Sequence, residues 1–173
     1  MNVMKRERNI VLIGMPGSGK STVGVILAKT LGMDFADGDI LICRREGCTL
    51  QEILDQRGLD AFLDVEEATI LETDYQNTVI ATGGSVPLRE AAMEHLEKNG
   101  DFVYIDVPLD ELTRRIHNIS TRGIAFAPGQ TLADIYAQRT PIYRRWADAT
   151  VEVATSDNAT EQVVEEIIRQ LKL

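Results

Sequence analysis

Cysteine and histidine are scarce in this sequence. Its 173 residues include two cysteines, Cys43 and Cys48, and two histidines. A disulfide-stapled scaffold needs more cysteines than this, and a structural zinc site needs further Cys or His ligands beside the pair. We therefore expect two reduced thiols in a protein that a hydrophobic core holds together.

Long apolar runs and an excess of positive charge are also missing. Glycine or charged residues interrupt every apolar stretch well before the ~20 residues of a membrane span, and the run Ile10–Ile13 is too short for a signal peptide. Lys and Arg number 18 against 27 Asp and Glu, a formal net charge of −9 that disfavours binding to a phosphate backbone. We expect a cytoplasmic monomer that binds neither membranes nor nucleic acid.

Buried strands alternate with helical patterns along the chain. The composition, with 44% hydrophobic and 26% charged residues, is that of a globular protein, and the length suits one domain over residues 1–173. Strands are predicted over 9–13, 34–36, 79–81, 102–105 and 150–153, and helices over 20–31, 40–46, 50–56, 61–73, 87–98, 109–116, 132–146 and 160–171. This alternation predicts a three-layer α/β/α fold around a central, mainly parallel five-stranded sheet.

A glycine-rich loop joins the first predicted strand to the first predicted helix. It reads Gly14-Met15-Pro16-Gly17-Ser18-Gly19-Lys20-Ser21 and matches the phosphate-loop pattern G-x-x-x-x-G-K-[ST] in its required context. In such a loop, backbone N–H groups face phosphate oxygens, the lysine reaches the β and γ phosphates, and the serine hydroxyl binds Mg²⁺. The predicted cofactors are ATP and Mg²⁺, and the predicted nucleotide-binding residues are Gly14, Gly17, Ser18, Gly19, Lys20, Ser21 and Thr22. The alternative is a glycine-rich turn with a solvated lysine.

The rest of the chain narrows the class of phosphate-loop protein. No N/T-K-x-D segment is present to read guanine, and the chain is too short for a transporter-type ATPase. A small kinase adds a substrate-binding helical insertion and a lid to the core sheet. We assign the insertion to about 38–75 and the lid to about 118–130, where Gly123, Pro128 and Gly129 interrupt any amphipathic order.

Two carboxylates directly follow the second predicted strand. Asp37 and Asp39 flank Gly38 and lie at the carboxyl edge of the sheet, where α/β proteins bind ligands. They can hold a Mg²⁺-bound water and accept a hydrogen bond from an attacking hydroxyl. The alternative is an aspartate that only caps the helix beginning at Ile40.

These segments together resemble the shikimate kinase family over nearly the whole chain. The resemblance rests on the phosphate loop, Phe35-x-Asp37-x-Asp39, Thr82-Gly83-Gly84 and Arg139-x-Pro141-x-Tyr143, in that order. It implies Asp37 near Mg²⁺, Asp39 on substrate hydroxyls, Gly83 and Gly84 as backbone contacts to substrate, and Arg139 on a substrate carboxylate. It further implies Arg122 of the lid on the phosphates and Arg115 against adenine. Lys20, Asp39 and Arg122 are thus the predicted catalytic residues.

Four positions depart from the family pattern, all in the acceptor half of the site. Cys43 stands where the family has an acid, Leu59 and Leu63 replace the acid and base of Gly-Glu-x-x-Phe-Arg, and Ser85 replaces the third glycine of a triplet. Leu63 removes an arginine that would share the substrate carboxylate. We therefore expect a more apolar acceptor pocket. Three hypotheses stay open: a kinase for shikimate, a kinase for another hydroxylated acceptor, and a non-catalytic nucleotide-binding regulator.

Overall fold

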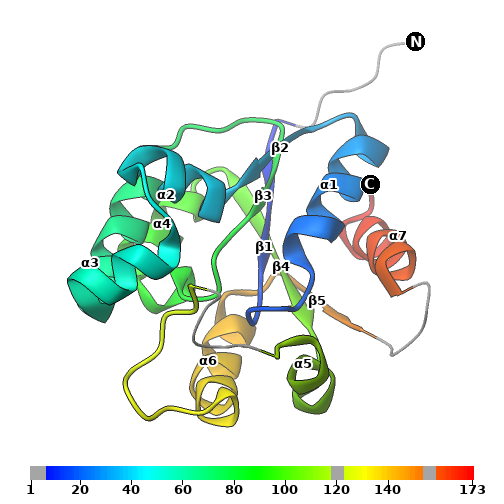
Figure 1. Cartoon of the computed structure of the whole chain (residues 1–173). Helices are drawn as coiled ribbons and strands as arrows, with labels where there is room; N and C mark the ends of the chain where they lie inside the picture. The colour runs from blue at the N-terminus through cyan, green and yellow to red at the C-terminus, as the bar shows by residue number, and fades with distance from the viewer. Residues whose placement is uncertain (1–6, 118–122, 154–158) are drawn as a thin grey trace.

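Five parallel strands form the centre of the molecule (Figure 1). The computed structural model describes residues 7–117, 123–153 and 159–173. The strands are β1 Asn9–Ile13, β2 Asp34–Asp37, β3 Thr78–Ala81, β4 Gly100–Asp106 and β5 Ala149–Glu152. Their order is β2-β3-β1-β4-β5, and all four neighbouring pairs run parallel, which confirms the predicted sheet.

The central strand β1 explains why the sheet is covered on both faces. All five of its residues are buried, and Leu12 lies opposite Ala81 of β3 and Val103 of β4. A strand that is apolar on both sides is stable only between two layers of helices. The shared register also brings the carboxyl ends of β1, β3 and β4 to one edge of the sheet.

Helices supply these two layers. They are α1 Lys20–Leu31, α2 Gly38–Glu46, α3 Leu50–Leu71, α4 Glu90–Glu97, α5 Leu109–Arg115, α6 Leu132–Trp146 and α7 Ala159–Leu171, with a 3₁₀ turn, η1, over Val86–Leu88. Helices α1 and α7 pack together on one face of the sheet, and α3, α4 and α6 lie on the other (Figure 1). Among the described helices, none is long and apolar enough to span a bilayer.

Two predicted helices differ in detail from the observed ones. The helix predicted over 87–98 is divided into η1 and α4, because Arg89 is extended (φ −111°, ψ 107°) and its guanidinium pairs with Asp64 at 3.0 Å. The segments predicted over 50–56 and 61–73 are joined in α3, with a kink at Gly58. Gly58 has a φ of 84°, a conformation that glycine adopts readily, so the predicted break at this residue is confirmed as a kink.

A second, smaller apolar cluster lies outside the main core. Its buried members are Ile42 of α2, Ile53 and Phe62 of α3, and Ala125, which precedes α6. Helices α2 and α3 therefore pack against the segment before α6 as well as against each other. This cluster lies beside the predicted acceptor pocket.

Helix α6 begins with a capping box that fixes its first turn. The Asp134 N–H donates to Thr131 Oγ1 at 3.2 Å, and the Thr131 N–H donates to Asp134 Oδ2 at 2.8 Å. These bonds satisfy backbone donors that no helical carbonyl can reach. The same helix carries the buried residues Arg139 and Tyr143 toward the sheet edge.

We predict that Thr131→Ala lowers the free energy of unfolding by about 1 kcal/mol, because the first turn of α6 loses its side-chain acceptor. Urea unfolding measures this change. The control is Gln138→Ala, an exposed position in the middle of the same helix. Equal stability of Thr131→Ala and Gln138→Ala would contradict the role given to the cap.

Candidate functional site

A cavity of about 320 Å³ opens at the carboxyl ends of β1, β2 and β3. Six segments of the sequence contribute to its wall, as expected for the ligand site of a parallel α/β sheet. The wall consists of Pro16, Gly17, Gly19, Lys20, Ser21, Thr22, Asp37, Asp39, Phe62, Glu66, Thr82, Gly83, Gly84, Ser85, Gly123, Ile124, Ala125 and Arg139.

The phosphate loop forms one side of this cavity. Gly17 and Gly19 have φ values of 78° and 91°, which allow the loop to curl before α1 begins. The Lys20 ammonium donates to the carbonyls of Gly14 and Met15, both at 2.8 Å. Within the loop, Gly14 and Ser18 are buried and do not line the cavity. Thr22, in the first turn of α1, does line it.

Lys20 is a buried cation in the middle of the loop. Burial lowers the pKa of its ammonium to about 8, with Asp39 opposing the shift and Arg139 adding to it. The ammonium is therefore largely charged at neutral pH and lies among backbone groups rather than in solvent. A charge in this position can contact phosphate oxygens with little competition from water.

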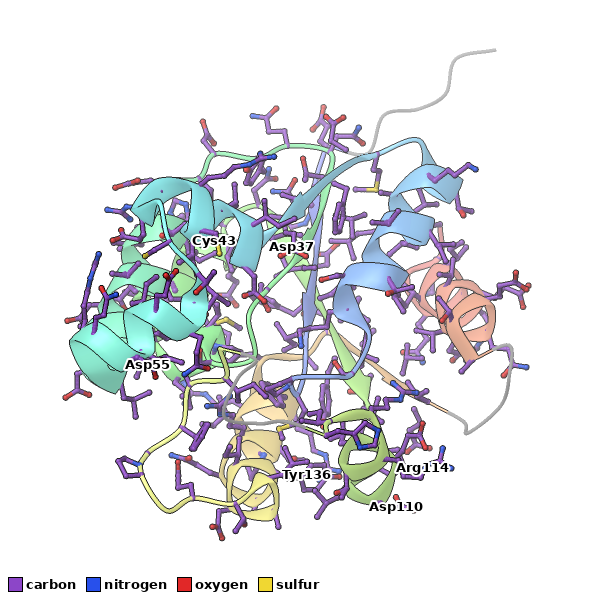
Figure 2. All side chains as sticks on the ribbon, in the orientation of Figure 1. Asp37, Cys43, Asp55, Asp110, Arg114 and Tyr136 are labelled. Atoms are coloured by element: carbon purple, nitrogen blue, oxygen red, sulfur yellow. The ribbon has the colours of Figure 1, made fainter. Side chains whose placement is uncertain are left out.

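Asp37 joins the loop to α2. Ser21 Oγ donates to Asp37 Oδ2 at 2.5 Å, while Asp37 Oδ1 accepts from the N–H groups of Asp39 at 3.0 Å and Ile40 at 3.3 Å. Figure 2 shows Asp37 at the start of α2, between this helix and α1. Asp37 therefore caps α2 and also lines the cavity.

The Ser21 hydroxyl and the Asp37 carboxylate fit a Mg²⁺ ion. Both are hard oxygen donors, and Mg²⁺ commonly takes one or two protein ligands and completes its shell with waters and phosphates. No group of three or more His, Cys, Asp or Glu side chains suitable for a metal occurs among the described residues. The donor set is therefore that of a nucleotide-associated Mg²⁺ rather than of an all-protein metal site.

Asp39 is an exposed residue of the cavity wall. Its surface opens onto the cavity, yet enough protein surrounds the carboxyl group to raise its pKa. The Asp37 carboxylate adds to this rise, and Lys20 opposes it. Asp39 is thus a carboxyl group that can form hydrogen bonds on the acceptor side of the cavity, and neighbouring charges influence its ionisation.

Arg139 is a buried guanidinium with unused donors. It is 2% exposed, and its Nη2 donates to the carbonyl of Ala125. Its Nε and Nη1 have no hydrogen-bond partner within the described part of the chain. Because a buried cation is costly without an opposing charge, these donors indicate a site for an anionic group in the cavity.

Tyr143 supports Arg139 from one turn further along α6. Its hydroxyl donates to the carbonyl of Gly84 at 2.5 Å, and its ring packs against Tyr104 at 5.3 Å between centroids. The bond holds the loop after β3 against α6. It thereby sets the position of Gly83 and Gly84 relative to Arg139.

Glu66 is a cavity residue that the sequence analysis did not identify. It is 2% exposed, and its Oε1 accepts from Ser85 Oγ at 2.6 Å. A Cβ on Gly83 would lie 2.4 Å from Glu66 Oε2, so only glycine leaves room for this carboxyl group. The available signal was position, because Glu66 follows Phe62 by four residues and precedes Ile70 by four, on the buried face of α3.

Burial raises the pKa of Glu66 to about 7. The bond from Ser85 opposes this rise, Asp39 increases it, and Arg139 and Lys20 lower it. Glu66 is therefore a carboxyl group that changes charge close to neutral pH. This carboxyl group lines the cavity together with Ser85, from which it accepts a hydrogen bond.

The structure corrects the expectation of a more apolar acceptor pocket. Leu59 and Leu63 pack against the second apolar cluster, and neither they nor Cys43 form part of the cavity wall. Leucine side chains at positions 59 and 63 gain more from burial between helices than from facing a polar cavity. Of the four departures, Ser85 alone lines the cavity, and the groups around it are polar.

The segment predicted as a lid lies partly outside the described residues. Residues 118–122, with Arg122, are in the part that the structure does not describe. From residue 123 onward the segment lies beneath α2 and α3, drawn in yellow in Figure 1. Gly123 donates its N–H to Gln51 Oε1 at 3.0 Å, and Ile124 and Ala125 are buried and line the cavity. Closure of a lid stays a prediction.

Arg115 lies beside the phosphate loop and outside the cavity wall. Its Nη1 donates to the carbonyl of Gly17 at 3.3 Å, and its Nε donates to Glu111 Oε1 at 2.9 Å. The guanidinium is thus held next to the loop by a carboxylate from the same helix. This position is compatible with contact to the base of a nucleotide.

Comparison with known proteins agrees with this geometry. The family model for shikimate kinase matches residues 16–172. A shikimate kinase of Sulfurihydrogenibium is 34% identical over 95% of this chain and 98% of its own length. Threonine synthase-like 1 of Homo sapiens is also 34% identical over 96% of this chain, which covers 22% of that protein. The structure of the Acinetobacter baumannii shikimate kinase in complex with shikimate superposes with a TM-score of 0.87 at 30% identity, covering 97% of this chain and 94% of that one.

We predict that Glu66→Gln becomes more stable relative to the wild-type protein as pH rises from 5 to 8. The folded protein holds the Glu66 proton up to about pH 7, whereas the unfolded chain releases it near its ordinary pKa of 4.5. The contribution of the Glu66 proton to the free energy of unfolding is therefore fully present at low pH and is lost as pH rises from about 4.5 to about 7. The wild-type protein should lose about 2–3 kcal/mol in this way. Urea unfolding at both pH values measures the difference. The exposed Glu94→Gln is the control, and an equal pH response in both variants would contradict the role of burial.

Proposed function

Because this chain belongs to the shikimate kinase family, a family of ATP-dependent kinases, we propose that it transfers the γ-phosphoryl group of ATP to a hydroxyl of shikimate. The carrying observation is Arg139, which lines the same cavity as the phosphate loop and Asp39 and has two donors without a hydrogen-bond partner among the described residues. A cation in that position selects an acceptor that bears a carboxylate as well as hydroxyls. The likeness to a shikimate kinase in complex with shikimate supports the same acceptor.

The donor half of the reaction uses the phosphate loop. We assign ATP phosphates to the backbone N–H groups of Gly17 to Thr22 and to the Lys20 ammonium, which stabilises charge on the transferred group. Ser21 and Asp37 would hold Mg²⁺, which neutralises phosphate charge when bound. Arg115 would contact the adenine, and Arg122 would reach the phosphates from the lid.

The acceptor half lies on the opposite wall of the cavity. Asp39 would hold the attacking hydroxyl and accept its hydrogen bond, which orients an oxygen lone pair toward the γ phosphorus. Arg139 would bind the acceptor carboxylate, and the backbone of Gly83 and Gly84 would contact the acceptor between them. Under this proposal residues 1–173 are one kinase domain, with an acceptor-binding insertion at about 38–75 and a lid at about 118–130.

A kinase for another hydroxylated acceptor is the second candidate. The observation that favours it is Leu63, because an arginine expected there would contribute a second cation to carboxylate binding. A regulator without catalysis has less support, since Lys20, Asp37, Asp39 and Arg139 all surround one cavity. Such a set has no evident use in nucleotide binding alone.

The direct experiment gives the purified protein Mg-ATP and shikimate and follows ADP release, with ³¹P NMR to identify the product. Shikimate should be phosphorylated in preference to neutral polyols. No phosphorylation of shikimate at millimolar concentration, together with turnover of another hydroxy acid or polyol, would replace shikimate by that acceptor.

We predict that Lys20→Met lowers turnover by about a hundredfold or more, because the variant keeps the side-chain stem and loses the charge beside the transferred phosphate. ADP release measures the loss, and thermal unfolding shows whether the fold persists. Lys29→Met, at an exposed position of the same helix, is the control and should leave turnover unchanged. Turnover of the Lys20 variant within a few-fold of wild type would refute the assigned role.

We predict that Arg139→Met raises the KM for shikimate by about a hundredfold, since two charge-assisted hydrogen bonds are lost. The KM for ATP should not change. The methyl ester of shikimate, which lacks the charge, should lose much less affinity. If Arg139→Met weakened the ester and the acid equally, Arg139 would not be the carboxylate-binding residue.

A further inference from the structure

Two of the departures from the family pattern meet at one buried group. Ser85 donates its hydroxyl hydrogen to Glu66 Oε1 at 2.6 Å, and Leu63 precedes Glu66 by three residues on α3. Residues three apart on a helix are neighbours on its surface. The guanidinium of an arginine at position 63 would therefore be within reach of the Glu66 carboxyl group, and this chain has leucine there.

Ser85 is built into its position. It is 3% exposed, and its backbone (φ −94°, ψ −10°) is one that any residue adopts, so a side chain is accommodated without strain. Its bond takes Oε1 of Glu66. The other oxygen, Oε2, lies in front of Gly83, facing the same small volume as Asp39 Oδ1.

The charged groups around Glu66 come from three helices. Lys20 of α1 and Arg139 of α6 favour its ionised form, and Asp39 of α2 disfavours it. Leu63 packs against the second apolar cluster and supplies no charge. Among the described neighbours, the Ser85 hydroxyl is the one direct hydrogen-bond donor to this carboxyl group.

We propose that Ser85 is a positioning residue that anchors Glu66 in place of a cation at position 63. This exchange, a hydroxyl at position 85 for a cation at position 63, determines the charge of the acceptor that the cavity binds. The choice of shikimate as probe rests on the proposed function. The anchoring of Glu66 by Ser85 does not depend on it.

The exchange changes the charge balance on the acceptor side. Among the described residues, Arg139 is the one cation on that side that is not engaged elsewhere, beside the carboxyl groups of Asp39 and Glu66, because Lys20 is bonded to the phosphate loop. A carboxylate acceptor brings a further negative charge and binds best while Glu66 keeps a proton. Since burial raises the pKa of Glu66 to about 7, binding of a carboxylate should weaken as pH rises through that value.

The first measurement compares shikimate with its methyl ester in the wild-type enzyme between pH 6 and 8.5. The KM for shikimate should rise by about tenfold over this range, the effect of one proton linked to one charge. The KM for the ester, which keeps the hydroxyls and lacks the charge, should stay flat. Parallel pH profiles for acid and ester would overturn the proposal.

The second measurement follows the Glu66 carboxyl carbon by ¹³C NMR across the same pH range, with Glu66→Gln to assign the signal. Ser85→Ala removes a hydrogen bond to the ionised form and should move the titration to higher pH. Leu63→Arg should move it to lower pH, and the double variant should lie between the two. Ser85→Gly separates loss of the hydroxyl from loss of the methylene.

The two measurements fail in distinguishable ways. Absence of shikimate phosphorylation refutes the proposed function alone, because the NMR titration needs no turnover. A Glu66 signal that does not move in Ser85→Ala overturns the anchoring even if shikimate is phosphorylated. If Leu63→Arg does not fold, Glu66→Gln tests the proposal instead. Glu66→Gln should abolish the pH dependence of the KM for shikimate, whereas a purely structural role of Glu66 would leave this pH dependence unchanged.

Discussion

Lys20 and Arg139 are two buried cations at one cavity, and the surrounding structure balances their charges. Lys20 donates to the carbonyls of Gly14 and Met15, whereas Arg139 donates to one carbonyl and has two donors without partners in the described part of the chain. Glu66 of α3 interacts with both cations, and Asp39 of α2 interacts with Lys20. Because charges away from water are stable only when compensated, the positions of these four groups depend on one another. The positive charge that stays uncompensated is available to bind phosphate and an anionic acceptor.

The fold delivers these groups from four different elements. Parallel strands end at one edge of the sheet, so the phosphate loop after β1, Asp37 at the end of β2 and the glycines after β3 meet without any long connection. Helices α3 and α6 then close the cavity from the other face with Glu66 and Arg139. The Tyr143–Gly84 and Ser85–Glu66 hydrogen bonds tie the loop after β3 to both helices. Acceptor recognition therefore depends on how firmly this short loop is held.

The departures from the family pattern acquire a physical meaning only in this context. Taken singly along the chain, Leu63 is a lost cation and Ser85 is a lost glycine. In the folded protein they concern the same carboxyl group, one by removing a neighbour on α3 and the other by donating a hydrogen bond across the cavity. Under our proposal, the pair acts on the charge of Glu66 rather than on the apolarity of the pocket.

Local pattern determined the strands, most of the helices, the phosphate loop and the two aspartates after β2, because periodicity, glycine placement and loop spacing are properties of neighbouring residues. The break at Gly58 was visible in the same way, and the extended Arg89 was not, since its conformation is coupled to a pairing with Asp64 on another helix. Glu66 was missed because a glutamate on a helix is normally solvated. Tertiary packing decided that it is buried, that Leu59 and Leu63 pack against the second apolar cluster instead of lining the cavity, and that Arg139 has donors left for a ligand. Each of these outcomes depends on which distant segments surround a side chain, and that information lies in the assembled layers rather than in any stretch of the chain.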